Sequence, residues 1–63
     1  MSLAENIKKL RERKDLSQGE LARLVDVSQP TIAQYEKGMK LPSIVVGVEL
    51  AKRLGTTCEE LVK

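Results

Sequence analysis

Residues 17–38 read SQGELARLVDVSQPTIAQYEKG, and they are the part of the chain most informative about its fold. It contains two segments with helical periodicity, joined only by Asp26, Val27 and Ser28. So tight a connection makes two helices cross at a steep angle. The crossing requires a small residue where the backbones approach, and Ala22 stands there. The turn requires a positive φ, which Asp26 tolerates better than most residues other than glycine.

Local signals set the limits of these two helices. Ser17 followed by Glu20 is a capping box, and Ser28 is the expected N-cap of the second segment. Pro30 then falls at the second helical position, where its missing N–H costs little, and Gly38 closes the helix as a left-handed C-cap. The apolar residues expected to fill the angle between the two helices are Leu21, Val25, Val27, Ile32 and Tyr35.

The N-terminal flank predicts a further helix. Leu3, Ile7 and Leu10 recur at i, i+4 and i+7, the spacing of one helical stripe. Ser2 followed by Glu5 forms another capping box, and the helix is expected to run to about Lys14.

The C-terminal flank predicts two more helices. Ser43 caps one that ends at Gly55, and Thr57 followed by Glu60 is a capping box that opens the last, short helix. The 63 residues therefore form a single domain, residues 1–63, of five short helices. The expected core stripe of the fourth helix is Ile44, Val48, Ala51 and Leu54.

The composition excludes several classes of function. The chain has no histidine, one cysteine and one aromatic residue, Tyr35, which we expect in the core. It therefore has no ligands for a His/Cys zinc site, no disulfide, no His-based triad and no set of aromatic faces for single-stranded nucleic acid. We expect no enzymatic activity and no cofactor. Cys58 is expected to be a small buried hydrophobe.

Charge and hydropathy limit the kinds of partner that the chain is expected to bind. Eleven basic and nine acidic residues give a net charge of +2, without a long basic arm, so bulk electrostatics alone would not support nucleic-acid binding. No apolar run approaches the length of a membrane helix, and no signal peptide is visible, so no membrane partner is expected. A lone thiol suits a reducing cytoplasm.

The pattern resembles the phage repressor and Cro family of helix-turn-helix proteins. The resemblance covers nearly the whole chain and implies an all-α, compact five-helix, lambda-repressor-like DNA-binding domain, with the helix-turn-helix formed by the second and third helices. It rests on Leu10-Arg11, Leu16-Ser17-Gln18, Glu20-Leu21-Ala22, Val27-Ser28, Ile32, Glu36-Lys37-Gly38, Pro42-Ser43, Ala51, Leu54-Gly55 and Glu60-Leu61.

The chain departs from the family at five positions. Asp26 replaces the usual glycine, Gly47 replaces a usual core leucine, and Thr56 replaces an aliphatic residue. Val45 and Val46 stand where polar residues are usual, and two interpretations of them remain open. They form a contact between two copies, or they are buried in a slightly rotated fourth helix, filling the space that Gly47 leaves.

The resemblance implies that the third helix, about residues 29–36, lies in the major groove. Its outward positions, which include Ala33, carry no charge, so they suit base edges better than phosphates. Glutamine pairs with adenine, and apolar groups can touch a thymine methyl. The alternative is an ordinary solvated polar face. The predicted base-reading residues are Gln29, Pro30, Thr31 and Gln34, the two glutamines foremost.

Phosphate contacts are expected around that helix. The second helix offers its N-terminal N–H groups and the Gln18 side chain, and the Ser28 and Thr31 hydroxyls can add contacts. Lys37 and Lys40 flank the loop where the family grips the DNA backbone; the alternative for each is a solvated surface charge. In the family, the pair that matches Arg11 and Glu36 forms a salt bridge that fixes the third helix.

The function implied is sequence-specific binding of double-stranded DNA by a bacterial or phage transcription regulator. The regulator is expected to be a repressor that binds a palindromic operator as a homodimer, in the bacterial cytoplasm and associated with the nucleoid. It would block or contact RNA polymerase. The alternative is a helix-turn-helix module that serves protein partners, such as an antitoxin-like or adaptor domain with a toxin-like partner.

Overall fold

Five α-helices make up the computed structural model, which describes residues 2–63. No strand is present in this part of the chain. The all-α architecture and the order of elements agree with the sequence prediction. The helices are α1 (Leu3–Arg13), α2 (Gln18–Leu24), α3 (Gln29–Glu36), α4 (Ile44–Arg53) and α5 (Cys58–Leu61).

A hydroxyl side chain caps the N-terminus of every helix. In each case it accepts the N–H of the residue three positions on, which satisfies one of the donors that a helix start leaves free. Reciprocal capping boxes close at Ser2–Glu5 and Ser17–Glu20, as predicted. The five caps are Ser2, Ser17, Ser28, Ser43 and Thr57.

The capping box predicted at Thr57 is only half formed. The Glu60 N–H donates to the Thr57 hydroxyl at 3.1 Å. The Glu60 carboxylate does not return to the N-cap, because it accepts the Lys63 ammonium group at 3.0 Å. A charged partner one turn away competes successfully with the backbone N–H for this carboxylate.

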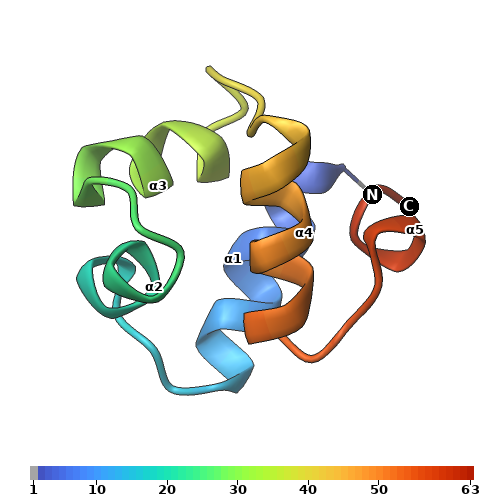
Figure 1. Cartoon of the computed structure of the whole chain (residues 1–63), viewed down its shortest axis with the longest axis horizontal. Helices are drawn as coiled ribbons and strands as arrows, with labels where there is room; N and C mark the ends of the chain where they lie inside the picture. The colour runs from blue at the N-terminus through green and yellow to red at the C-terminus, as the bar shows by residue number, and fades with distance from the viewer. Residues whose placement is uncertain (1) are drawn as a thin grey trace.

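The core lies where the helices meet. Helix α2 packs on α3, α1 packs on α3 and α5, and α4 packs on α5 (Figure 1). Ala22, 3% exposed, lies among the buried residues as predicted, while Val27 is only partly buried. The buried apolar residues are Ile7, Leu21, Ala22, Val25, Ile32, Tyr35, Leu50, Ala51, Leu54 and Leu61.

Helix α4 is rotated relative to the predicted stripe. Ala51 and Leu54 are buried as expected, but Ile44 is 86% and Val48 is 41% exposed. Val46 packs partly against the core instead, in line with Leu50 and Leu54 at i+4 and i+8. The prediction for Ile44 and Val48 was therefore wrong, because the core-facing stripe of this helix begins at Val46. Of the two interpretations left open, burial holds for Val46, whereas Val45 remains 74% exposed.

Cys58 was expected in the core but is exposed. It is the first residue of α5, a helix of only four residues, and Leu61 is the residue of that helix that enters the core. One turn of helix presents a single residue to the core, so the second apolar side chain faces outward.

One buried polar contact was not predicted from the sequence. Asn6, 6% exposed, donates from its side-chain amide to the carbonyl of Leu61 at 2.8 Å and so links α1 to the end of α5. Within residues 2–63, no buried side-chain polar atom lacks a hydrogen-bond partner. No helix in the same range is long and apolar enough to cross a membrane.

Two aspartates occupy the left-handed region of φ/ψ space. Asp26 has φ +60°, as predicted for the α2–α3 turn, and Asp15 has φ +56° before α2. We expect Asp26→Gly to raise the free energy of unfolding by up to about 1 kcal/mol and Asp26→Val to lower it by about 1–2 kcal/mol, since left-handed φ penalises a Cβ and most of all a branched one. Urea denaturation measures both. As a control, Lys8→Gly in the middle of α1 should destabilise by about 1 kcal/mol.

The cap of α2 makes stability depend on pH. The pKa of Glu20 lies below its ordinary value of 4.5, because its carboxylate accepts the Ser17 N–H at 2.8 Å and also interacts with the Ser17 hydroxyl. A lowered folded-state pKa stabilises the fold above pH 4.5 and ceases to do so as the pH falls further. We expect Glu20→Gln to be less stable than the parent in urea at pH 7 and the difference in stability to be smaller at pH 3. An equal gap at the two pH values would contradict this account.

Candidate nucleic-acid interface

Helix α3 presents an uncharged polar face to solvent. Gln29, Pro30 and Gln34 are exposed, whereas Thr31 and Ala33 are half-buried. Ile32 and Tyr35, three residues apart, turn into the core, which fixes the opposite face outward. Pro30 lies in the first turn, as predicted. The residues predicted to read bases thus lie together on one helix, and the two glutamines and the proline protrude most.

A largely buried ion pair holds the end of this helix. The Arg11 guanidinium donates to Glu36 through Nε–Oε2 at 2.6 Å and Nη2–Oε1 at 3.2 Å, which confirms the predicted bridge. The two side chains are 11% and 4% exposed. Arg11 Nη1 also donates to the Leu16 carbonyl at 2.7 Å, so one guanidinium joins α1, the α1–α2 connection and α3. The hydrogen bonds to Glu36 raise the pKa of Arg11 above its ordinary value.

The network continues to the DNA-reading candidates. Gln18 Nε2 donates to Glu36 Oε1 at 3.0 Å, and Gln29 Nε2 donates to Gln18 Oε1 at 2.9 Å. A chain of hydrogen bonds therefore runs from Arg11 through Glu36 and Gln18 to Gln29. The sequence pattern predicts separate roles for Gln18 and Gln29 but does not predict their contact. One signal for it existed: each glutamine follows the N-cap of its helix, and the tight turn brings these two helices together.

The contact with Gln18 determines which hydrogen-bonding groups of Gln29 remain free. Its amide nitrogen uses one hydrogen on Gln18, which leaves the second hydrogen and the whole carbonyl oxygen free. An adenine needs an acceptor for N6–H and a donor for N7. Gln29 retains both, and its contact with Gln18 favours one orientation of the side-chain amide.

The hydroxyl groups at the start of α3 bond to each other. Ser28 Oγ accepts the Thr31 N–H at 3.3 Å, and the two hydroxyl oxygens lie 2.7 Å apart. The capping role of Ser28 is thus confirmed. Its predicted contact with phosphate competes with these internal bonds.

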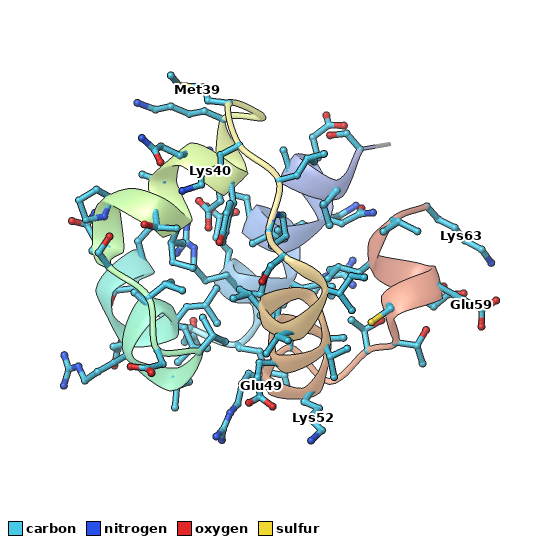
Figure 2. All side chains as sticks on the ribbon, turned by 45° about the horizontal axis from the view of Figure 1, so that its top comes forward. Met39, Lys40, Glu49, Lys52, Glu59 and Lys63 are labelled. Carbon is cyan, nitrogen blue, oxygen red and sulfur yellow. The ribbon has the colours of Figure 1, made fainter. Side chains whose placement is uncertain are left out.

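Two lysines follow α3. Lys37 is the C-cap of α3, and Lys40 lies in the following loop; both are exposed. The turn at Gly38, with φ +73°, is fixed by Met39 N–H donating to the Gln34 carbonyl at 3.0 Å. Figure 2 shows Lys40 close to α3, on the opposite side of the molecule from Glu49 and Lys52. The structure therefore keeps positive charge beside the uncharged face.

Other site chemistry is limited. Residues 2–63 contain no group of three His, Cys, Asp or Glu side chains placed to hold a metal ion. A surface cleft with a volume of about 520 Å³ is lined mainly by α1, including Lys9 and Arg13, together with Thr56, Glu60 of α5 and Lys63.

Comparison with known families decides the identity of this fold. The helix-turn-helix family pattern matches residues 7–61, which include all of α2, the turn and α3. The chain belongs to the helix-turn-helix family. Among curated proteins, this helix-turn-helix chain is 37% identical over 59 residues to the cryptic phage CTXphi transcriptional repressor RstR of Vibrio cholerae. The match covers 94% of this chain and 53% of RstR, so the chain spans about half the length of that relative.

Solved structures of the same type agree. The phage P22 c2 repressor, crystallised in complex with a synthetic operator, superposes with a TM-score of 0.97 at 27% identity, covering 100% of this chain and 96% of that one. The restriction-modification controller protein C.AhdI from Aeromonas hydrophila gives a TM-score of 0.87 at 30% identity, covering 94% and 89%. The predicted lambda-repressor-like fold is confirmed.

The ion pair provides a test of the site's construction. We expect Arg11→Met to lower the free energy of unfolding by about 3–5 kcal/mol, because Glu36 would remain buried without its partner. Arg11→Met combined with Glu36→Met should recover much of that loss, since no buried charge then remains. Chemical denaturation followed by circular dichroism measures both. The exposed Lys52–Glu49 pair supplies the control, and Lys52→Met should change stability by less than about 1 kcal/mol.

Proposed function

We propose that this chain is a sequence-specific double-stranded DNA-binding module that reads bases with α3. The observation that carries the proposal is the uncharged, exposed face of Gln29, Pro30 and Gln34, aligned by the hydrogen-bond chain from Arg11. A fixed glutamine amide suits adenine, and Pro30 suits a thymine methyl. Thr31, half-buried and bonded to Ser28, is the secondary contact.

Phosphate contacts would set the register of α3 on the duplex. Lys37 and Lys40 would lie against the backbone on one side. The first turn of α2 would offer N–H groups and the second amide hydrogen of Gln18 on the other. Ser28 would add its hydroxyl. Such contacts position the protein, and the bases then specify the sequence.

The relatives support the proposed biological role. RstR is named as a phage transcriptional repressor, and the P22 c2 repressor was crystallised with an operator. By analogy, we place this chain, as a single module without enzymatic activity, in a bacterial or phage transcription regulator in the bacterial cytoplasm. We expect a homodimer on a palindromic operator, because one small module buries too little surface for tight binding. The bound dimer would repress by excluding RNA polymerase.

Selection of bound sequences from random duplexes tests the proposal. We expect a two-fold symmetric sequence, with half-sites ~34 Å apart, to be recovered. Gln29→Ala and Gln34→Ala should then each relax the preference at one base position, at a cost of about 1–3 kcal/mol in binding free energy. Lys37→Ala and Lys40→Ala are the matched controls, since loss of a phosphate contact weakens all sequences alike. If both glutamine variants kept the base preferences of the parent, the assignment of Gln29 and Gln34 as base-reading residues would be wrong.

The competing function makes an opposite prediction. If the module served protein partners alone, as an antitoxin-like or adaptor domain, it would show no binding to generic duplex DNA even at low salt. We expect instead that affinity falls steeply with salt concentration, because several phosphates release counterions on binding.

A further inference from the structure

We propose that the cleft between α1 and α5 is a docking site for an acidic segment of a partner protein. This α1–α5 cleft has a volume of about 520 Å³, and the segment that fits it is an extended peptide with two carboxylates separated by one residue. No residue of α2 or α3 lines the cleft, and Figure 1 shows α5 on the side of the molecule away from these two helices. The docking site is therefore separate from the face proposed to read DNA and does not depend on that function.

Two cations of α1 line the cleft without a partner. Lys9 and Arg13 are exposed, and neither takes part in an ion pair within residues 2–63. They are four residues apart, so they are neighbours on one face of the helix, where two like charges repel each other. A carboxylate bound beside each of them would form an ion pair and relieve this repulsion. The cleft therefore favours an anionic ligand.

Two polar side chains in the same cleft have unused hydrogen-bonding capacity. Asn6, 6% exposed, donates through Nδ2 to the Leu61 carbonyl, but no group of residues 2–63 donates to its Oδ1. Thr56 is half-buried; its backbone N–H donates to the Ala51 carbonyl at 2.8 Å, whereas its hydroxyl has no partner in the same range. An aliphatic residue is usual in the family at the position of Thr56. The cleft of this chain therefore carries a hydroxyl that the packing of the fold does not require.

These two groups match a peptide backbone. The Oδ1 of an asparagine accepts a hydrogen bond, and a threonine hydroxyl donates or accepts one. Each residue of an extended peptide offers an N–H donor and a carbonyl acceptor, so a peptide can satisfy both groups. Phosphodiester groups offer acceptors but no N–H donor, and the residues that line the cleft include no aromatic side chain on which a base could stack. A peptide therefore fits the cleft better than a nucleic acid does.

The spacing of the two cations selects the pattern of acidic residues. Four residues of α-helix advance by about 6 Å, which is the rise along α1 from Lys9 to Arg13. In an extended peptide, side chains two residues apart lie on the same side, at a spacing of about 6.6–6.8 Å. Two acidic residues separated by one residue therefore place both carboxylates opposite the two cations. Adjacent acidic residues would point to opposite sides of the peptide.

The α5 side of the cleft directs the acidic segment toward α1. Glu60 and Lys63 line this side, and the Glu60 carboxylate accepts the Lys63 ammonium group at 3.0 Å. Because each of these two charges already has a partner, the unpaired positive charge of the cleft lies on the α1 side. The side chains that line the cleft carry three positive charges and one negative charge in total. This balance complements an acidic segment and disfavours a basic one.

Titration of the isotopically labelled chain with a short synthetic peptide at low salt tests the cleft. The peptide has two glutamates separated by one alanine, is flanked by glycines and is blocked at both ends. We expect a dissociation constant in the millimolar range, because two exposed ion pairs and two hydrogen bonds stabilise the complex only modestly. The backbone amide NMR signals of residues 6–13 and 56–63 should shift most. A peptide with adjacent glutamates should bind at least about twofold more weakly, and one with two glutamines at least about fivefold more weakly.

Single substitutions separate docking in the cleft from general attraction. Lys9→Ala and Arg13→Ala should each weaken peptide binding about two- to fivefold, because each removes one ion pair. Thr56→Val keeps the shape of the side chain and should weaken binding about two- to tenfold, because it removes one hydrogen bond. Lys8→Ala is the matched control: Lys8 is exposed on α1 beside Lys9 but does not line the cleft, so its variant should bind like the parent. Circular dichroism checks that each variant folds.

The docking site would be wrong if Lys8→Ala weakened peptide binding as much as Lys9→Ala and Arg13→Ala, or if the largest shifts fell outside residues 6–13 and 56–63. Equal binding of the glutamine peptide would contradict the role of the two cations. Inorganic phosphate that bound as tightly as the glutamate peptide would show a general anion site and contradict a peptide partner. Binding of duplex DNA is measured separately, so its absence would refute the proposed function while the peptide titration still decided the cleft.

Discussion

The buried bridge between Arg11 and Glu36 is the interaction on which the rest of the site depends. Two opposite charges removed from water stabilise a fold only if their hydrogen-bonding groups are satisfied. Here Glu36 accepts from Arg11 at 2.6 and 3.2 Å and from Gln18 at 3.0 Å. Arg11 donates in addition to the Leu16 carbonyl. The pair therefore fixes α3 against α1 and, through Gln18, favours one orientation of Gln29.

The residues of α3 divide into a set that positions the helix and a set that faces outward. Buried residues of α3 hold the helix in place, and its outward residues remain free of charge and of internal bonds, apart from Gln29 and Thr31. Positive charge lies beside this face, at Lys37 and Lys40, rather than on it. A net charge of +2 is too small to bind DNA by attraction alone, so its placement matters more than its size.

Most of the fold could be predicted because it depends on local signals. These signals are the hydroxyl before each helix, the tight turn at Asp26 and the glycines after α3 and α4. Each acts over three or four residues and can be recognised without knowledge of distant contacts. The resemblance to the repressor family added the Arg11–Glu36 bridge, which joins residues 25 positions apart.

The errors concern contacts that local signals do not determine. The rotation of α4 depends on which side the core lies, and the apolar run from Ile44 to Val48 fits more than one rotation. Cys58 is exposed because a helix of one turn places only Leu61 in the core. The Gln18–Gln29 bond and the Asn6 bond to α5 join residues brought together by the crossing of helices, which periodicity alone does not specify.

The role of α3 on DNA can be tested by titrating the isotopically labelled chain with a selected duplex and following the backbone amide NMR signal of each residue. If α3 is the reading helix, the largest shifts fall on residues 28–40 and the first turn of α2. Binding that left the signals of residues 29–36 unchanged would contradict the account.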